Sequence, residues 1–456
     1  MRADLLIKSG EVVIPGQGLW PADVAISDGK VAALLEAGTS VEARRVVDAS
    51  GRLVLPGVID AHTHLTLGPG CDGYESETRS AAIGGVATSL SYLLDSGDLA
   101  EVVQRDIDAG GGRSCGDYGL HPALVTDDQL AAFPDTIDKL GIPSFKFFMT
   151  FRGEEGAYIG IPGNDDGFLF RLLRMVAGLP GSLPCIHAEN VELVWALGPE
   201  AQRDGDGTIR DWDANRPDFV EAEATRRVLY LAEVAGAPIY VVHITCRAAL
   251  EAVREAKARR PSMVFGETCV HYLSLTCDTA PSPVGKVNPP LRHADDVEAL
   301  WEGVADGTID VVGSDHVCRK LASKEGDIWK ATSGFPGVAT LVPLFLTEGT
   351  RRGLDVARLV DKMTAAPAAI FGLAPRKGSL MPGTDGDVTI VDPEARKVIR
   401  AAELGSFSDY SPYEGRQVSY TAAHTILRGQ VIAEDGAYVG KPGVGGYVPR
   451  TRTGVR

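Results

Sequence analysis

The chain has 456 residues, of which 44% are hydrophobic and 23% charged, and its formal net charge at pH 7 is −16. The chain is too long for one domain of ordinary size, but its length suits a barrel of roughly 250 to 320 residues with a smaller domain attached. Because an acidic surface repels phosphate backbones and anionic lipids, the charge argues against nucleic-acid and membrane partners.

Membrane-spanning and secretory segments are not expected from the sequence. No apolar run reaches the roughly 18 to 20 residues that cross a bilayer. The N-terminal stretch MRADLLIKSGEVVIPG has the pattern of a strand and turn, not of a signal peptide. The seven cysteines are scattered and form no CxxC pair, which favours a reducing compartment and predicts a cytoplasmic location.

Both ends of the chain are predicted to be rich in β-structure. Residues 1–55 contain short apolar runs separated by turn signals, among them the hairpin pair Asp28-Gly29. The same pattern returns late in the chain, in GDVTIVDP and HTILRGQVIAEDGAYVG. We therefore expect residues 1–55 and 376–456 to build one small β-sandwich domain, with the Gly-rich C-terminal segment as an extended arm.

The middle of the chain, residues 56–375, is predicted to form a (β/α)₈ TIM-type barrel, which places the protein in the α/β class. Short apolar runs alternate there with segments of helical spacing, such as EAEATRRVLYLAEVAG. The candidate strands are GVIDAH, GVATSLSY, DYGLHPALV, SFKFFM, SLPCIH, PIYVVHI, SMVFGET and IDVVGS. Repeated βα units are typical of such a barrel, whose catalytic side chains lie at the C-terminal ends of the strands.

Several of these strands carry side chains of the types that bind metal ions. His62 and His64 are two residues apart, and the two-residue period of a strand points both to one face. Imidazoles suit zinc and related first-row metals, and a carboxylate completes such a site. The other candidates lie in or directly after separate strands: Lys146, His187, His243 and Asp315. Because a core gains nothing from repeated polar groups that must each find partners, a metal site explains the set better than hydrogen-bonded core residues do.

Lys146 lies within the apolar strand SFKFFMTF, where a buried ammonium is costly. In one interpretation the strand bends and the amine reaches the surface. In the other, desolvation lowers the pKa of the lysine, and the neutral amine adds carbon dioxide to give a carbamate. We favour the second interpretation, because a carbamate is an anion that can bridge two metal ions.

The sequence resembles the dihydropyrimidinase/hydantoinase family of cyclic amidohydrolases, within the amidohydrolase superfamily. The matching stretches run in order over nearly the whole chain: VLPGVIDAHTH, SFKFFM, IHAEN, ANRPDFVEAEA, VVHIT, ETCVHYL, NPPLR, GSDH, GFPG, KGSLMPGTDGDVTIVDP and DYSPYEG. The resemblance implies that His62, His64 and Asp315 bind one metal ion and that His187 and His243 bind a second. It further implies two divalent ions, commonly zinc, bridged by Lys146 as N6-carboxylysine and by a hydroxide.

This resemblance implies an enzyme that opens the ring of a small cyclic amide or imide, of the hydantoin or dihydropyrimidine type. Two metal ions about 3.5–4 Å apart lower the pKa of a bridging water and polarise the amide oxygen. We expect the hydroxide to attack the ring carbonyl, while Asp315 accepts its proton and passes it to the leaving nitrogen. The resemblance also implies a homo-oligomer, a dimer or a tetramer.

Three residues depart from the family pattern around the substrate. Phe151 stands where most of the family has a tyrosine that hydrogen-bonds the developing oxyanion, and losing such a donor costs on the order of 10²–10³ in rate. Tyr158, Thr150 or a metal ion acting alone are candidate replacements. Asn288 stands in place of a common serine and Ser333 in place of a common asparagine, both in the expected substrate groove. We therefore expect a preferred substrate other than hydantoin or dihydrouracil.

Other functions stay open at this point. The alternative is an allantoinase, or a hydrolase of another cyclic imide or lactam. The reason is that NPPLR has Asn288 where a serine is common in the family. RPDFVEAEA and DYSPYEG fit the hydantoinases better. Dihydroorotase fits less well, since HTHLT lacks an arginine directly after the histidines. A non-enzymatic scaffold relative would have lost its metal site, whereas every ligand position is filled here.

Overall fold

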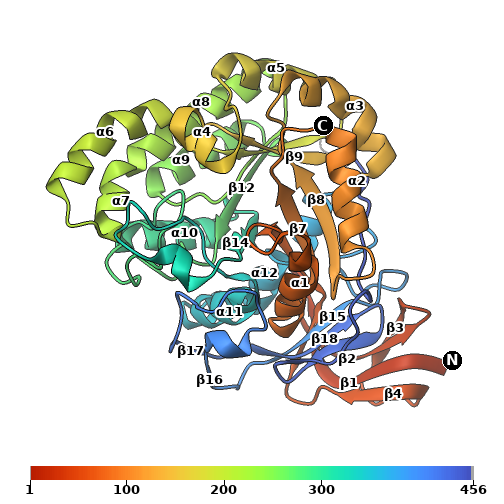
Figure 1. Ribbon diagram of the computed structural model, residues 1–456. Helices are drawn as coiled ribbons and strands as arrows, with labels where there is room; N and C mark the ends of the chain where they lie inside the picture. Colours follow the sequence, from red (N-terminus) through yellow and green to blue (C-terminus); the bar gives the residue numbers. More distant parts are fainter. Residues whose placement is uncertain (1, 453–456) are drawn as a thin grey trace.

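Strands from both ends of the chain meet in one sheet. The computed structural model describes residues 2–452, apart from the side chains of Glu154 and Tyr158. The sheet has nine strands, in the order β20-β19-β18-β15-β5-β1-β2-β3, with β4 paired to β1 (Figure 1). The strands are β1 (Arg2–Ile14), β2 (Gly18–Ser27), β3 (Lys30–Glu36), β4 (Glu42–Asp48), β5 (Leu53–Pro56), β15 (Val388–Asp392), β18 (Thr421–Leu427), β19 (Gln430–Glu434) and β20 (Ala437–Tyr438). The predicted union of the two chain ends in a small β-structure is confirmed, while the boundaries after residue 55 and before residue 376 stay predictions.

The turn between β2 and β3 has the predicted sequence and conformation. Asp28 and Gly29 have φ angles of 51° and 72°, so both lie in the left-handed region. A two-residue hairpin turn with two positive φ angles matches the right-handed twist of its strands. Asp28 also donates its backbone N–H to Asp4 Oδ2 at 2.9 Å, which fixes the turn to β1.

The middle of the chain forms the predicted barrel of parallel strands. They are β6 (Val58–His64), β7 (Val86–Leu93), β8 (Asp117–Pro122), β9 (Ser144–Phe148), β10 (Leu183–His187), β11 (Ile239–Val241), β12 (Val264–Cys269), β13 (Val311–Gly313) and β14 (His316–Val317). β6, β7 and β8 pair in one parallel sheet with β14, and β9 to β13 pair in a second. Ser314 and Asp315 alone separate β13 from β14, which pairs with β6, so the two short strands share the eighth position and close that side.

The other seam of the barrel, between β8 and β9, is narrow. An isolated bridge from Ala123 to Lys146 joins the two sheets there. The C-terminal segment crosses this seam: Val448 N–H donates to Tyr118 O of β8 at 2.7 Å. The buried guanidinium of Arg450 donates to Leu120 O of β8 and to Ser144 Oγ of β9. The predicted C-terminal arm therefore lies on the barrel of its own chain.

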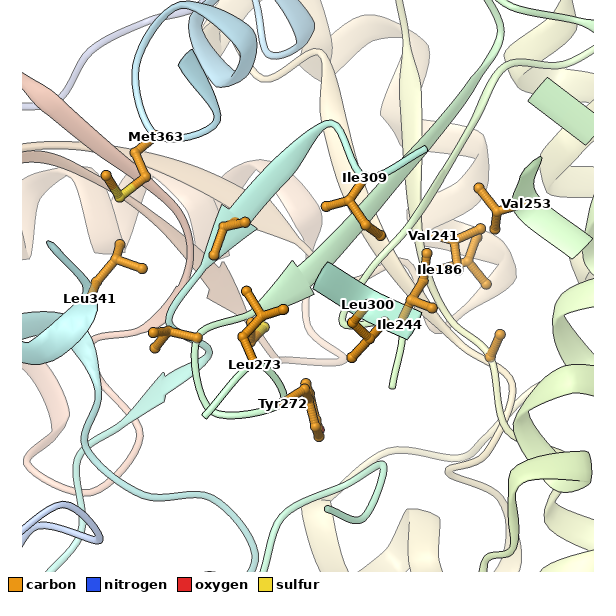
Figure 2. Close-up of a cluster of buried hydrophobic side chains, with 14 of the residues drawn as sticks. Ile186, Val241, Ile244, Val253, Tyr272, Leu273, Leu300, Ile309, Leu341 and Met363 are labelled. Atoms are coloured by element: carbon orange, nitrogen blue, oxygen red, sulfur yellow. The ribbon is translucent and has the colours of Figure 1, made fainter. Parts of the chain in front are cut away.

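Helices cover the outside of the barrel (Figure 1). They are α1 (Gly73–Ile83), α2 (Leu99–Gly110), α3 (Asp127–Leu140), α4 (Gly153–Ile159), α5 (Asp166–Ala177), α6 (Val191–Asp204), α7 (Ile209–Asn215), α8 (Asp218–Ala235), α9 (Arg247–Arg259), α10 (Ala294–Asp306), α11 (Leu341–Arg351), α12 (Val356–Asp361) and α13 (Ala365–Ile370). Ile244, Leu300 and Ile309 belong to the core between the strands and this helical layer (Figure 2). Within the described residues, no helix combines the length and hydropathy needed to cross a membrane.

α8 illustrates why these segments are helical. Pro217 precedes its first residue, and Gly236, with a φ angle of 74°, ends it in the left-handed region that glycine tolerates. Val220, Ala224 and Val228 recur at a spacing of four residues and are buried, so one face of the helix packs inward.

A buried lysine joins the barrel to the terminal sheet. Lys377 Nζ lies 2.7 Å from Asp117 Oδ2 of β8, and it also pairs with Asp387, directly before β15. Asp385 Oδ2 lies 3.4 Å from the same amine. Three carboxylates grouped this closely are a possible cation site, and here the ammonium of Lys377 lies among them.

Candidate metal centre

The six predicted metal-binding side chains line one cavity at the C-terminal ends of the barrel strands. His62 and His64 end β6, Lys146 lies in β9, and His187 is the last residue of β10. The remaining two follow strands: His243 comes two residues after β11, and Asp315 lies between β13 and β14. The structure thus brings together side chains that are up to 253 positions apart in the sequence, from His62 to Asp315.

One carboxylate oxygen faces two imidazoles. Asp315 Oδ1 lies 3.1 Å from His62 Nε2 and 3.3 Å from His64 Nε2. These three atoms are close enough to contact a single cation. The other two histidines lie alongside: the ring centroids of His187 and His243 are 4.5 Å apart, and those of His62 and His243 are 5.5 Å apart.

Two buried glutamates hold the outer nitrogens of these rings. Glu267 Oε1 lies 2.6 Å from His62 Nδ1, and it accepts the backbone N–H of His243 at 3.2 Å. Glu189 Oε2 lies 2.6 Å from His187 Nε2. Metal-binding histidines usually donate their second nitrogen to a carboxylate or carbonyl, which fixes the ring and its tautomer. Sequence reasoning missed both glutamates, although each lies in a stretch that carries the family resemblance, ETCVHYL and IHAEN.

The electrostatics of the cavity favour an anionic Asp315 and neutral nitrogens at Lys146 and His243. At His62, by contrast, the effect of burial is outweighed by Glu267 and Asp315, which raise the pKa of the ring. Burial opposes the charge of Asp315, but His62 and His64 outweigh it and hold the pKa of this carboxyl well below its usual value. Burial lowers the pKa of Lys146, and burial places the pKa of His243 well below its usual value. Lone pairs on neutral nitrogens are what metal binding and carbamate formation both need.

Two buried ring nitrogens in the cavity have no hydrogen bond among the described residues. His243 Nδ1 is one, and the other is His62 Nε2, whose contact is the 3.1 Å approach of Asp315 Oδ1. Among the described residues, no hydrogen bond or ion pair reaches Lys146 Nζ, which lies 4.4 Å from the centroid of the Tyr92 ring. Because buried polar atoms normally find partners, this donor set of imidazoles, one carboxylate and one amine fits divalent first-row cations.

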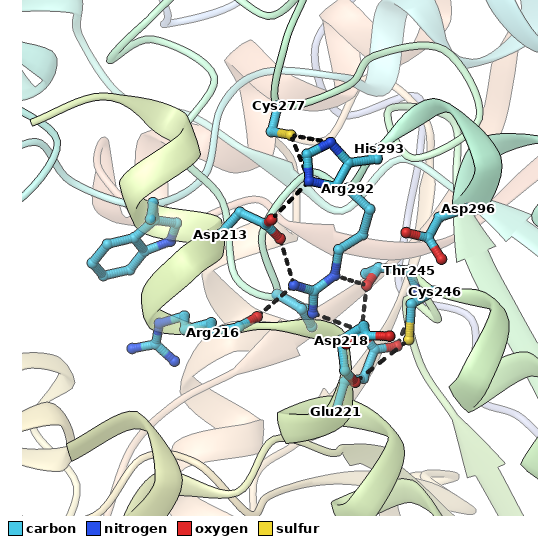
Figure 3. A network of polar contacts seen from close by, with 12 residues as sticks. Asp213, Arg216, Asp218, Glu221, Thr245, Cys246, Cys277, Arg292, His293 and Asp296 are labelled. Atoms are coloured by element: carbon cyan, nitrogen blue, oxygen red, sulfur yellow. Dashed lines mark hydrogen bonds and ion pairs between the residues drawn. The ribbon is translucent and has the colours of Figure 1, made fainter. Parts of the chain in front are cut away.

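The backbone is left-handed at two of the six residues. His243 has a φ angle of 38° and Asp315 one of 45°. Such conformations cost about 1–3 kcal/mol each and persist only where the surroundings impose them. After His243, the backbone N–H of Thr245 donates to Glu221 Oε1 at 2.8 Å, and Arg292 pairs with Glu221 Oε2 at 3.2 Å (Figure 3).

A similar frame surrounds Asp315. Ser314 N–H donates to Asp60 Oδ1 at 3.1 Å, on the strand that carries His62. His316 lies 2.8 Å from Glu77 Oε2 through Nε2, and its Nδ1 accepts the backbone N–H of Gly337 at 3.0 Å. Both nitrogens of His316 are therefore occupied by structural contacts, and the ring turns away from the cavity that Asp315 lines.

Three of the four predicted substrate contacts line the same cavity: Phe151, Asn288 and Ser333. The fourth, Tyr158, lies in α4, but its side chain is outside the described part of the structure. Asn288 Oδ1 accepts a hydrogen bond from Trp212 Nε1 at 3.0 Å. The lining residues that were not singled out from the sequence include two with polar groups: Tyr92, whose ring lies against Lys146, and Arg319.

The chain is similar in sequence and structure to known cyclic-amide hydrolases. The model of the amidohydrolase family matches residues 236–432. A D-hydantoinase of Rhizobium radiobacter is 36% identical over 470 residues, covering 98% of this chain and 99% of its own. An allantoinase of Escherichia coli is 34% identical over 446 residues, covering 95% of each chain. A solved D-hydantoinase structure superimposes with a TM-score of 0.90 at 34% identity, covering 99% of this chain and all of that one.

Proposed function

This chain belongs to the hydantoinase and dihydropyrimidinase family of the amidohydrolase superfamily, and from that premise we propose how its site opens a cyclic amide. The protein is a metal-dependent hydrolase of cyclic amides. The observation that carries the detailed proposal is the convergence of six candidate metal-binding side chains on one cavity, where His243 Nδ1 is buried with no hydrogen bond among the described residues.

Each metal position has its own donors in this proposal. His62, His64 and Asp315 hold one divalent ion, and His187 and His243 hold the other. Lys146 joins the two positions as N6-carboxylysine: its neutral amine forms a bond to the carbon of carbon dioxide and releases one proton. The four imidazoles favour zinc among divalent ions of suitable size. When bound, the two metal ions lower the pKa of a water molecule and polarise the amide oxygen of the substrate.

The chain's own residues handle the proton and the ring. Asp315 takes the proton of the attacking water and delivers it to the ring nitrogen as the carbon–nitrogen bond breaks. Its position beside His62 and His64 holds this carboxylate in place. Asn288 and Ser333 offer polar atoms to the edge of the ring, while Phe151 and Phe148 form an apolar wall. Phe151 supplies no hydroxyl, so the oxyanion relies on other groups.

The proposal has three further points: a second candidate activity, the assembly and the location. Hydrolysis of allantoin is the second candidate activity, because the Escherichia coli allantoinase aligns over 95% of this chain. A homo-oligomer, either dimer or tetramer, is the expected assembly, and a cytoplasmic location is the expected one. These two properties stay predictions.

The test combines metal content with turnover. Purified protein is stripped with a chelator and reloaded with zinc, manganese or cobalt, and bound metal is measured by elemental mass spectrometry. Hydrolysis of hydantoin, dihydrouracil, allantoin, succinimide and a lactam is followed before and after reloading. The proposal expects about two ions per chain and activity that returns with them. Full activity in the stripped protein would contradict it.

A further inference from the structure

The cavity contains a cation that the proposed chemistry does not use. Arg319 lies two residues after β14 and lines the same cavity as His64 and Asp315. Among the described lining residues outside the six proposed metal ligands, Arg319 alone has a permanent charge. The rest are apolar, such as Leu67 and Val317, or neutral and polar, such as Asn288.

Among the described residues, no carboxylate pairs with this guanidinium. Within the described residues, no ion pair involves Arg319, and its buried Nε has no hydrogen-bond partner. The contact that fixes the residue is made by its backbone, whose N–H donates to Ser408 Oγ at 3.0 Å. Burying part of a guanidinium whose N–H donors have no acceptor costs free energy, unless a ligand in the cavity accepts those hydrogen bonds.

Two buried lysines lie behind this part of the cavity: Lys324, which is near Arg319, and Lys286, which is near Lys324. Lys324 Nζ donates to Thr332 O at 2.7 Å and to Lys286 O at 3.2 Å. Lys286 Nζ donates to Ala331 O at 2.8 Å. Both amines therefore hold the segment that presents Ser333 to the cavity, and among the described residues neither forms an ion pair with a carboxylate.

Burial lowers the pKa values of both lysines, so neither adds a full positive charge near neutral pH. The pKa of Lys324 lies well below its usual value through burial first and repulsion from Lys286 and Arg319 second. Burial lowers the pKa of Lys286 to about 7. Arg319 is therefore the permanent positive charge of this cavity wall, and in a chain with a net charge of −16 it attracts anionic ligands to that place.

We propose that Arg319 binds an anionic group of the substrate, so that the preferred substrates are cyclic amides or imides that carry a carboxylate. The planar guanidinium suits a carboxylate through two parallel hydrogen bonds. This inference rests on the proposed function, because it names the substrate class of the same site. The reaction stays a hydrolysis: water adds its oxygen to the ring carbonyl carbon, the carbon–nitrogen bond breaks, and the nitrogen gains the proton. The carboxylate does not react; it binds Arg319 and positions the substrate.

The experiment compares matched anionic and neutral substrates on the metal-loaded full chain. Hydantoin-5-acetate and hydantoin-5-propionate are paired with their carboxamides, which have the same shape without the charge. The wild type should show a kcat/KM about 10- to 100-fold higher for the better carboxylate than for its carboxamide, the scale of hydrogen bonds to a charged group. In Arg319→Gln this ratio should fall to about one, mainly through a higher KM for the carboxylate. Arg319→Lys should retain part of the preference.

Lys320→Gln is the matched control, because it removes the neighbouring positive charge outside the cavity. The Lys320 ammonium lies over the Phe407 ring, 4.3 Å from the centroid, and donates to Phe407 O. This variant should keep the carboxylate preference of the wild type.

Binding gives a second readout that does not depend on turnover. The ring-opened carboxylate products should raise the melting temperature of the holoenzyme, and Arg319→Gln should lose that rise while its melting temperature without ligand stays close to the wild type. Equal kcat/KM for carboxylates and carboxamides in the wild type, or an unchanged ratio in a folded Arg319→Gln, would overturn the inference. Failure of the metal-loaded wild type to hydrolyse any cyclic amide, charged or neutral, would instead overturn the proposed function.

Discussion

Glu267 and Asp315 contact the two nitrogens of one imidazole: Glu267 Oε1 lies 2.6 Å from His62 Nδ1, and Asp315 Oδ1 lies 3.1 Å from His62 Nε2. The ring is therefore fixed between two carboxylates from neighbouring parts of the barrel. Tyr240 donates its hydroxyl to the other oxygen of Glu267 at 2.8 Å, which in turn fixes the glutamate.

Glu267→Gln should weaken metal binding without removing a ligand. The amide keeps the size of the side chain but withdraws the negative charge behind His62, so we expect an affinity about 10- to 100-fold lower. Competition with a chromogenic chelator measures this change. Glu302→Gln is the control, because Glu302 lies on the exposed side of α10. Equal metal affinity in Glu267→Gln and the wild type would show that Glu267 does not tune the site.

Lys146→Arg should lose both metal and activity. Arginine keeps a positive charge but cannot form a carbamate, so the anion that joins the two metal positions is missing. We expect kcat to fall by more than about 10³, as for loss of an essential group. Native mass spectrometry should show the mass of one carbon dioxide on the wild type and none on the variant. Lys139→Arg, on the outer helix α3, serves as control. A variant with normal metal content would refute the bridging role.

Phe151→Tyr should raise turnover of unsubstituted hydantoin. Phe151 lines the metal cavity, and its ring centroid lies 5.3 Å from that of His187. A hydroxyl added there supplies an oxyanion donor, and such donors are worth on the order of 10²–10³ in rate when well placed. Steady-state kinetics on hydantoin and dihydrouracil measure the gain. If neither substrate is turned over faster, the missing tyrosine is not what limits these reactions.

His271 should make the protein less stable in acid. The ring is fully buried, and burial lowers its pKa to about 4. The unfolded chain protonates this histidine near pH 6.5, so unfolding binds an extra proton between about pH 6.5 and 4. Stability should fall by up to about 3 kcal/mol as pH drops through that window. His271→Leu should lack this part of the pH dependence in urea unfolding.

The control for that experiment is His293→Leu, because the His293 side chain is 56% exposed. Its pH profile should follow that of the wild type. Identical slopes for His271→Leu and the wild type between pH 6.5 and 4 would mean that His271 is not the group responsible.

Lys377→Met should destabilise the protein by about 3–5 kcal/mol, the usual cost of removing one partner from a buried ionic group. Asp117, Asp385 and Asp387 would then face one another with their shared cation gone. Chemical denaturation measures the loss. Lys397→Met is a control at an exposed position of β16 (Lys397–Val398). A decrease in the free energy of unfolding of less than about 1 kcal/mol would mean that Lys377 is not what stabilises this junction.

The barrel and its six candidate ligands were predictable because both signals are local. A strand buried on both faces is a short apolar run, and a polar residue at its end stands out, as His187 does after LPCI. Glu189 and Glu267 gave no such signal, since a single carboxylate in a strand or loop looks the same whether it faces solvent or a histidine ring.

Arg319 illustrates a second limit. Its residue type, next to Lys320 in the sequence, suggests an ordinary surface pair. Only the turn after β14 decides that Arg319 faces the cavity while Lys320 lies over Phe407. The local sequence also does not predict the left-handed backbone of His243 and Asp315, because tertiary contacts impose it.

The contacts of Arg450 have a bearing on how the chain is made. One guanidinium reaches Leu120 on β8 and Ser144 on β9, across the seam where the barrel has a single bridge. During synthesis the barrel therefore lacks these contacts until Arg450 has left the ribosome, and proteolytic cleavage before Arg450 would remove them from the folded protein.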